Sequence, residues 1–399
     1  MIGILYISYD GMLEPLGQSQ VLAYLKHLSV GRRIHLISFE KKQDWADEIE
    51  RNRVARNLAT TKIIWHPLFY HKSPSALATG WDILCGVAVG LWLILRFQLQ
   101  IVHARSYVSS VIALALKRIT GVKFIFDMRG FWADEKVDGG AWHKDGLLYK
   151  VAKGFERRFI LSADHLVSLT HAAVTEIQLF PYLRGCIPPL SVIPTCADLT
   201  RFVPMPEAIR TRGDNNFVLG YVGSVGTFYL FDQVVTCYLK LKQLRADARL
   251  LIVNRGQHEY LLERLALAGV PSDSIELTSA THEEMPFKIA TMSAGIFFIK
   301  PVFSKQASAP TKLAEFLGCG IPCLANAGVG DMEAVLEGDK VGVVLTSFDD
   351  ESINEDLERF LKLVDNSETR QRCVESAHRH FSLDEGVARY NVIYNSLSK

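Results

Sequence analysis

Short apolar runs rich in β-branched residues alternate with helix-length periodic segments along this chain, and the series occurs twice. In the first half the runs are GILYISY, IHLISF, KIIWH, IVHA, KFIFD, HLVSL and SVIP, and in the second half FVLGYVGSVG, RLLIVN, SIELTS, AGIFFI, PCLAN and VGVVL. Several are apolar at nearly every position, as is typical of parallel strands buried on both faces. The pattern therefore predicts an α/β protein with two open, doubly wound parallel sheets.

A segment poor in apolar periodicity separates the two series. Residues 192–216 are rich in Pro, Asp, Asn and charge, which indicates a linker with the domain boundary near residues 200–215. A chain of 399 residues is also too long for one compact core. We expect Rossmann-like domains at residues 1–200 and 201–399, facing across a cleft, with the last helix able to pack on either. Ligands should bind at the carboxyl ends of the strands.

The balance of charge limits the class of ligand. Lys plus Arg number 44 and Asp plus Glu number 43, so no overall field exists to hold a nucleic acid. The seven cysteines are scattered and lack the spacing of a metal site, as expected of reduced, intracellular thiols. Any anionic ligand must therefore be held by local groups.

The N-terminal stretch MIGILYISYDG enters a strand-like run without a basic region or a cleavage site, which favours a cytoplasmic protein. One segment, residues 81–97, is unusually apolar, but Asp82 and Arg96 bracket an uncharged run of only 13 residues. A spanning helix needs about 20 apolar residues, so we favour a buried core helix. The alternative is peripheral contact with the inner face of a membrane, for which Trp81 and Trp92 would be suited.

Three groups suited to anions occur in the second half. YVGSVG places Gly223 and Ser224 in a turn between a strand and a helix, where bare amides and a hydroxyl suit a phosphate. Lys300 ends the run AGIFFIK. The next helix opens with SAPTK, which contains Ser308, Thr311 and Lys312. Together these groups predict a site for a diphosphate that needs no metal.

Glu315 follows Lys312 by three residues and shares its helix face. A carboxylate at this position can accept hydrogen bonds from both hydroxyls of a ribose. The alternative is an ion pair with Lys312, worth only about 0.2–0.5 kcal/mol. Because the ribose explains more of the surrounding pattern, we assign Glu315 to ligand binding.

The first half opens with a different glycine loop. YDGMLEPLGQSQ follows the first strand without a GxGxxG pattern, so the usual dinucleotide fingerprint is absent and a nicotinamide oxidoreductase is disfavoured. Gly17 would let the backbone approach a ligand at the start of the next helix. A purely structural turn is the alternative.

The order of these motifs resembles that of the retaining glycosyltransferases of family four, which have the GT-B architecture. The resemblance rests on the Gly turn, FFIKP and SAPTKLAEFLGCGIPCLANAGVGDMEAVL, and on IPTCADLTRF between the halves. It covers essentially the whole chain and is strongest at residues 295–335. It implies that Glu315 holds the donor ribose and that the preceding helix start holds the diphosphate. Ala307 stands where the family's EX7E motif has its first glutamate, and Ser224 and Tyr229 stand in the loop that carries the family's Arg and Lys.

The acceptor is then expected in the first domain. FIFDMRGFWADEKVDGGAW ends a buried strand with Asp127 and Arg129 and continues into a loop with Trp132, Asp134 and Glu135. Carboxylates bond sugar hydroxyls and Trp faces stack on sugar rings, so the last three are assigned to acceptor binding. Asp127 and Arg129, with Lys300, are the catalytic candidates. A structural Asp/Arg pair that braces the loop is the alternative.

VHARS ends the preceding strand with His103 and Arg105, which are further candidates for acceptor binding. A lone histidine at a strand end is more often structural. Taken together, the sequence predicts transfer of a sugar from a nucleoside-diphosphate donor to a glycan or lipid-linked glycan in polysaccharide or glycoconjugate biosynthesis, with no cofactor and no metal. A non-catalytic GT-B partner of another transferase and a UDP-sugar epimerase are the alternatives. The carboxylate missing at Ala307 argues against the epimerase.

Overall fold

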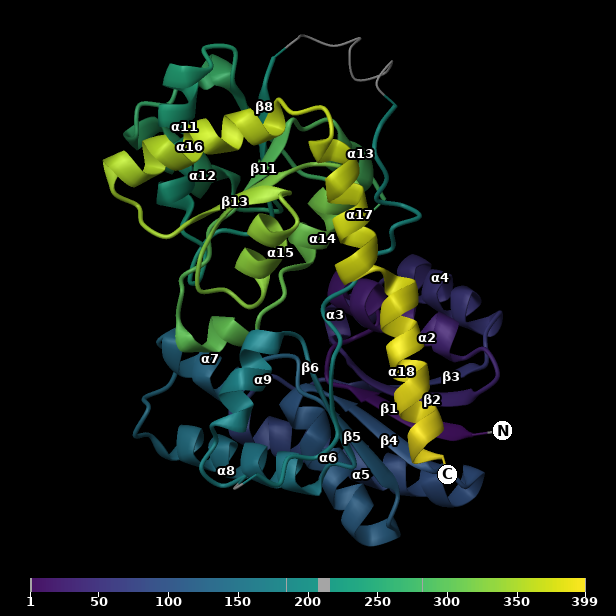
Figure 1. Cartoon of the computed structure of the whole chain (residues 1–399). Coiled ribbons are helices and arrows are strands. Elements are labelled where there is room, and N and C mark those ends of the chain that lie inside the picture. The colour runs from purple at the N-terminus through teal and green to yellow at the C-terminus, as the bar shows by residue number, and fades with distance from the viewer. Residues whose placement is uncertain (1, 184, 207–215, 282, 399) are drawn as a thin grey trace. The chain divides into compact units, whose positions relative to one another are not determined.

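The computed structural model describes residues 2–183, 185–206, 216–281 and 283–398, and it contains two compact units. The first comprises Met1–Pro194 together with Leu383–Lys399, and the second comprises Thr195–Ser382. Figure 1 shows that each unit contains its own sheet covered by helices. Residues 207–215 of the predicted linker lie outside the described residues.

The sheet of the first unit is parallel throughout and has seven strands in the order β3-β2-β1-β4-β5-β6-β7. The strands are β1 (Gly3–Ser8), β2 (Arg33–Glu40), β3 (Ile63–Phe69), β4 (Ile101–Arg105), β5 (Lys123–Asp127), β6 (His165–Ser168) and β7 (Leu190–Val192). The two central strands, β1 and β4, are buried along their whole length. This burial explains why their sequences are apolar at almost every position.

Helices cover both faces of this sheet (Figure 1). They are α1 (Pro15–Gly17), α2 (Ala23–Leu28), α3 (Lys42–Trp45), α4 (Glu48–Ala59), α5 (Ser75–Phe97), α6 (Ser106–Thr120), α7 (Trp132–Asp138), α8 (Leu147–Ser162), α9 (His171–Gln178) and α18 (Leu383–Leu397), with the π-helical turn η1 (Gln18–Leu22). Strand order reverses direction at β1, so right-handed crossovers put α2 and α4 on one face and α5, α6 and α8 on the other. The C-terminal helix α18 packs against α2.

The sheet of the second unit is also parallel and has six strands in the order β10-β9-β8-β11-β12-β13. They are β8 (Val218–Val222), β9 (Arg249–Val253), β10 (Ile275–Thr278), β11 (Ala294–Ile296), β12 (Cys323–Asn326) and β13 (Gly342–Leu345). The helices are α11 (Phe231–Leu244), α12 (His258–Leu267), α13 (Met285–Ala290), α14 (Thr311–Gly318), α15 (Met332–Gly338), α16 (Asp350–Val364) and α17 (Thr369–Phe381), with the 3-10 turns η2 (Ser272–Ser274) and η3 (Phe303–Ala307).

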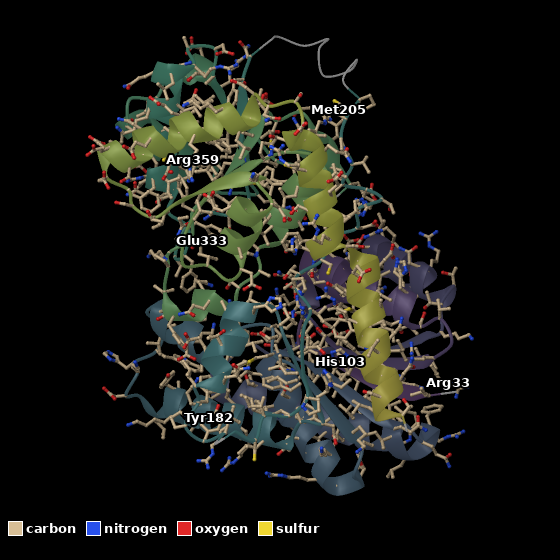
Figure 2. The ribbon with its side chains drawn as sticks, in the orientation of Figure 1. Arg33, His103, Tyr182, Met205, Glu333 and Arg359 are labelled. Carbon is tan, nitrogen blue, oxygen red and sulfur yellow. The ribbon has the colours of Figure 1, made fainter. Side chains whose placement is uncertain are left out.

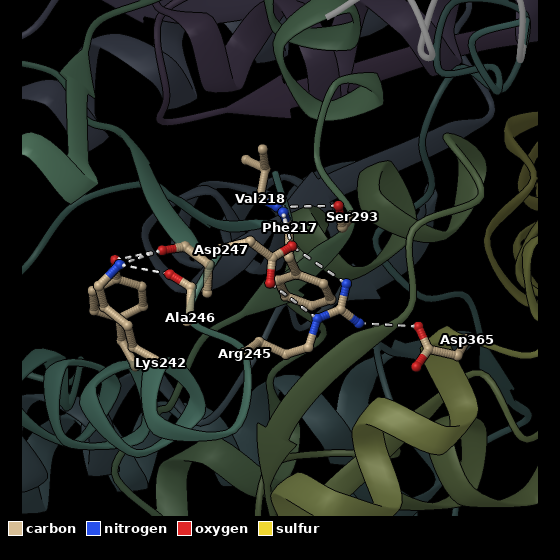
Figure 3. Close-up of polar contacts among 10 residues, drawn as sticks. Phe217, Val218, Lys242, Arg245, Ala246, Asp247, Ser293 and Asp365 are labelled. Atoms are coloured by element: carbon tan, nitrogen blue, oxygen red, sulfur yellow. Dashed lines mark hydrogen bonds and ion pairs between the residues drawn. The ribbon is translucent and has the colours of Figure 1, made fainter. Parts of the chain in front are cut away.

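Polar side chains fix the amino ends of the central strands in this unit, as Figure 3 shows. The backbone N–H of Phe217 donates to Asp247 at 3.2 Å, and that of Val218 donates to the hydroxyl of Ser293 at 3.1 Å. Arg245 joins Asp247 to Asp365. Since this edge is occupied by structural contacts, the opposite, carboxyl edge is the place to look for a ligand site.

The predicted strands are present in both units, and the two-sheet α/β class is confirmed. The two units divide between Pro194 and Thr195, and the last helix, α18, which could have packed on either domain, belongs to the first unit. Residues 195–202 join the second unit because Ala197 pairs with Ser382 and a side chain on Gly318 would meet Leu199 and Phe202. The expected buried core helix is α5, and it is buried along one face only.

Candidate active site

Two side chains that follow the neighbouring strand β9 fix the turn after β8. Asn254, directly after β9, donates from Nδ2 to the carbonyl of Gly223 at 2.8 Å. Gln257 accepts from the N–H of Val225 and donates to its carbonyl, at 3.0 and 2.9 Å. Gly223 has a φ of 114°, a conformation that favours glycine. The predicted Gly turn is thus a fixed loop at the carboxyl edge of the sheet.

Lys312 points from the first turn of α14 to the underside of this loop. A β-carbon on Gly223 would lie 2.9 Å from its Nζ. The ammonium group lies over the ring of Tyr229, 4.3 Å from the centroid, and farther from two other rings, Tyr221 at 5.4 Å and Phe297 at 5.5 Å. Aromatic faces attract a cation, but they do not replace a hydrogen-bond acceptor. The cation is therefore held in place without being neutralised.

The burial of Lys312 is unusual for a lysine. The residue is only 7% exposed, and Nζ makes no hydrogen bond within the described residues. Burial lowers the pKa of Lys312 to about 8, although Glu315 acts in the opposite direction. An uncompensated buried ammonium is costly, and such groups mark sites where a ligand supplies the missing charge. An anion at this position would supply it.

Glu315 lies one turn farther along α14 and is partly buried. Burial raises the pKa of Glu315 to about 7, against the lowering effects of Lys312 and Arg201. In the described part of the chain no ion pair joins Glu315 to Lys312, so the ion-pair alternative does not hold. A carboxylate with a raised pKa is ready to accept hydrogen bonds from hydroxyl donors, which would favour its ionised form.

The other predicted donor groups lie near the same edge. Lys300 has an exposed side chain, and its backbone N–H donates to Phe228 of the Gly223 loop at 2.8 Å. Ser224 is exposed, and its carbonyl accepts from Tyr221 at 2.8 Å. Two half-buried hydroxyl residues, Ser308 and Thr311, flank the start of α14, whose N-terminus has no side-chain cap. The structure therefore brings the sequence-predicted residues of the second unit to one edge of one sheet.

Sequence analysis missed several groups at this edge. Asn254 directly follows β9 and Asn326 ends β12, and Asn326 both accepts from and donates to the backbone of Ile299 at 2.8 Å. Lys305 is buried with its Nζ 3.8 Å from the ring centroid of Phe228. A polar residue directly after a buried strand was the available signal for the two asparagines. The burial of Lys305 had none, since η3 shows no periodicity.

In the first unit Asp127 is tied to the C-terminal helix. Its Oδ2 accepts from the hydroxyl of Tyr390 in α18 at 2.9 Å and lies 3.5 Å from Nε2 of His103. Nδ1 of His103 lies 2.7 Å from the hydroxyl of Tyr394, and Figure 2 shows His103 beside α18. Burial raises the pKa of Asp127, but the charges of Arg129, His103 and Arg105 outweigh it and hold that pKa below its usual range. His103 and Asp127 are both about 1% exposed, and their contacts with Tyr394 and Tyr390 anchor α18 to the sheet.

Two arginines at neighbouring strand ends remain candidates for ligand contact. Arg105 ends β4 and lies 3.3 Å from Asp10, yet its buried Nη1 has no hydrogen-bond partner among the described residues. Arg129, two residues after β5, has a φ of 58° and lies 3.9 Å from Asp127. A positive φ at a non-glycine residue is uncommon and strained, and such residues are enriched at functional sites. These two guanidinium groups could donate hydrogen bonds to a ligand at the carboxyl ends of β4 and β5.

The loop residues predicted for acceptor binding make contacts within the first unit, and their role toward an acceptor stays a prediction. Asp134 is buried and accepts from Tyr149 at 2.7 Å and Lys153 at 3.0 Å. Trp132 packs edge-on against Trp142, with centroids 5.1 Å apart. Glu135 is half-buried within α7. Charged and aromatic residues gather here because they build the contact between α7 and α8.

Gly17 lies inside α1, not in an open loop. A β-carbon there would come within 2.0 Å of the carbonyl oxygen of Gly11. The glycine is required by this close approach of two backbone segments, which accounts for it without a ligand. Glu40 holds the same loop by accepting from the N–H groups of Met12 and Leu13 at 2.8 and 3.2 Å.

No group of three or more His, Cys, Asp or Glu side chains is placed to hold a metal ion among the residues that the structure describes. The cations at the candidate site in the second unit are lysines and the dipole of α14.

Comparison with known families assigns this domain. Residues 207–380 match the family model described as "Glycosyl transferases group 1". Over this range the chain is similar to the glycosyl transferases of group 1. It is a glycosyltransferase, and the matched region contains the whole site built around Lys312 and Glu315. Among curated protein sequences, none matched.

Solved structures share the fold of this glycosyltransferase over both units. Sucrose-phosphate synthase from Thermosynechococcus elongatus has a TM-score of 0.74 at 13% identity, covering 100% of this chain and 99% of that one. Anabaena Alr3699/HepE in complex with UDP and glucose has a TM-score of 0.69 at 13% identity, covering 99% and 100%. The lipopolysaccharide outer core galactosyltransferase WaaB has a TM-score of 0.65 at 14% identity, with the same coverage. The GT-B fold of two Rossmann-like domains is confirmed.

Proposed function

We propose that this glycosyltransferase moves a sugar from a nucleoside-diphosphate-sugar to a hydroxyl of a glycan or lipid-linked glycan, with retention of anomeric configuration, as in family four. The proposal depends above all on the buried ammonium of Lys312 near the N-terminus of α14, for which the described residues provide no hydrogen-bond acceptor. A diphosphate supplies the acceptors that are missing. We place the reaction on the cytoplasmic side of a membrane in polysaccharide or glycoconjugate biosynthesis.

The donor would be held by its two ends. Lys312, the open N–H groups of α14 and the Gly223 loop are assigned to the diphosphate, with Lys300 and the hydroxyls of Ser308 and Thr311 beside them. Glu315, one helical turn on, is assigned to the ribose hydroxyls. Anabaena Alr3699/HepE, which shares the fold, has been solved with UDP-glucose, which makes this compound the first donor to test.

In the reaction, the bond between the anomeric carbon and the β-phosphate oxygen breaks while the acceptor oxygen bonds to the same carbon. The acceptor's proton leaves with the departing nucleoside diphosphate. Negative charge builds on that leaving group, and a preorganised cation in a site shielded from water stabilises it most effectively. Lys312 meets this requirement because its position is fixed by packing before a ligand arrives.

The acceptor would meet the first unit at the carboxyl ends of its strands. Arg105 and Arg129 offer donors there for hydroxyl or phosphate oxygens. Ala307 lies buried in η3, where the family's first glutamate would contact the transferred sugar. The backbone and Lys305 are the groups left to hold that sugar.

The test is a thermal-shift series with UDP-glucose, GDP-mannose and ADP-glucose, followed by measurement of nucleoside diphosphate release. A ligand that binds only the folded protein raises the melting temperature. We expect one donor to do so in the wild type and not in Lys312→Met, and release to accelerate when acceptor extract is added. A shift that is equal in the variant would show that the donor does not use this site.

A further inference from the structure

Helix α5 leaves a continuous apolar ridge uncovered on the first unit. Residues at helical spacing along one side of α5 are exposed: Leu77, Trp81, Leu84, Ala88, Trp92 and Leu95. Leu84 is 64% exposed, and the two tryptophans are 58% and 56% exposed. With 23 residues the helix is about 35 Å long, so the ridge crosses much of one side of the unit. Exposed apolar patches of this extent mark binding surfaces.

The opposite side of α5 is fixed to the protein. A β-carbon on Gly86 would lie 2.5 Å from Ile112 of α6, and one on Gly90 would lie 2.7 Å from Leu116. Asp82 is buried and accepts from Tyr9 at 2.8 Å and from Nδ1 of His71 at 2.6 Å. By length and composition α5 could cross a bilayer, the single helix of this kind among the described residues. Its attachment along the sheet means that it presents a side to its surroundings and does not cross.

The exposed charged residues of helices α5, α6 and α8 all have the same sign. Helices α5, α6 and α8 cover the same face of the sheet, with α6 in contact with both of its neighbours (Figure 1). The acidic residues of these three helices, Asp82 and Glu156, are both buried. The exposed charged residues of the three helices are all basic: Arg96, Arg118, Lys150, Arg157 and Arg158. Within the described residues none of these five forms an ion pair.

This arrangement is unusual in a chain whose formal net charge is only +1. Exposed apolar side chains also occur on α8, where Leu147, Leu148 and Val151 alternate with basic side chains. The three helices thus combine aromatic and aliphatic side chains with basic residues that form no ion pair, and the helices themselves have no exposed carboxylate. This combination is complementary to the polar boundary of an anionic bilayer. A protein partner would need a matching apolar and acidic groove, whereas a bilayer offers both features along its entire surface.

We infer that the outer face of α5, α6 and α8 docks the first unit on a bilayer rich in anionic lipids. Trp81, Leu84 and Trp92 would enter the boundary between headgroups and acyl chains, and Arg157, Arg158 and Lys150 would meet the headgroups. This inference deepens the peripheral location proposed above. It depends on the surface of the first unit alone, so it can be tested without turnover.

The experiment is co-sedimentation of the full chain with vesicles of phosphatidylcholine, with and without phosphatidylglycerol. We expect binding to the mixed vesicles and little to phosphatidylcholine alone. The double variant Leu84→Glu, Trp92→Glu should lower binding at least about tenfold, because it places charge at the apolar boundary. Arg157→Gln should lower it about fivefold, on the mixed vesicles only. The matched control is Ile49→Glu, an exposed residue of α4 on the other face, which should bind like the wild type.

Two outcomes would overturn the inference: absence of binding to mixed vesicles, or an equal loss in Ile49→Glu. Light scattering gives a third. A dimer that is abolished by Leu84→Glu would assign this face to a second copy of the chain. The thermal shift with UDP-glucose, measured without lipid, should be the same in the wild type and the double variant. A failure of the proposed donor site would therefore appear in that shift, separately from a failure of vesicle binding.

Discussion

The side-chain nitrogen of Lys312 lies 2.9 Å from the position that a β-carbon on Gly223 would occupy. A side chain at position 223 would therefore displace the ammonium group of Lys312, so the loop and the lysine are structurally coupled. The φ of 114° at Gly223 adds backbone strain to any substitution.

Gly223→Ala should lower the stability of the protein by about 1–3 kcal/mol and abolish the thermal shift with the donor. The new methyl group would displace the ammonium of Lys312 and force a positive φ on alanine. Melting temperature with and without UDP-glucose measures both effects. Gly338→Ala, in a helix with open space around the glycine, is the control and should not destabilise.

Lys312→Met should raise the melting temperature of the unliganded protein and weaken UDP binding by about 1.5–3 kcal/mol. The gain arises because methionine fills the aromatic surroundings without a buried charge, and the loss arises because the diphosphate loses its cation. Differential scanning fluorimetry and calorimetric titration give the two values. Lys362→Met, an exposed lysine on α16, should change neither.

Affinity for UDP should fall as the pH rises above about 8. The pKa of Lys312 is lowered to about 8 in the free protein, and a bound diphosphate favours the protonated form. Above that pKa, binding must take up a proton, so the apparent affinity decreases with each further step in pH until the pKa of the complex is reached. Titrations from pH 7 to 10 should show this slope in the wild type. Lys312→Met should give a flat profile over the same range.

Glu315→Gln should weaken UDP binding by about 1–3 kcal/mol and leave inorganic pyrophosphate binding nearly unchanged. The amide keeps the shape of the side chain but loses the charge that accepts from ribose hydroxyls. Burial raises the pKa of Glu315 to about 7, so its ionisation destabilises the free fold as the pH rises from about 4.5 to 7. The variant should lose that decline in melting temperature. Equal losses for UDP and pyrophosphate would remove Glu315 from the ribose.

Tyr390→Phe should destabilise the protein by about 1–2 kcal/mol, because Asp127 would lose a buried hydrogen bond. Donor affinity should not change, since this contact lies within the first unit. Thermal melting compares the variant with Tyr260→Phe, an exposed tyrosine of α12 that should behave like the wild type. A loss of turnover with unchanged melting would instead give Asp127 a direct chemical role.

The strands and the shared helix face of Lys312 and Glu315 could be predicted because both are local. A buried strand shows as a run of apolar residues, and residues three apart share a helix face. The burial of Lys312 could not be predicted in this way. Its surroundings come from β8, from the loop that carries Tyr229 and from the segment after β11, and no pattern in the sequence links the three.

The same limit applies to the polar residues of the first unit. Asp127 was assigned to chemistry because it ends a buried strand, but its hydrogen-bond partner is 263 residues away in α18. Asp134 was assigned to an acceptor, and it binds Tyr149 and Lys153 of α8. Strand-end polar residues mark either a ligand or a distant helix, and only tertiary contacts separate the two.

Because α18 belongs to the first unit, the two units are completed in a fixed order during translation. As the chain leaves the ribosome, residues 195–382 emerge and can close their own sheet before Leu383–Lys399 has been made. Until then His103 and Asp127 face water where Tyr394 and Tyr390 will lie. The half of the protein that is translated first is thus the half that is completed last.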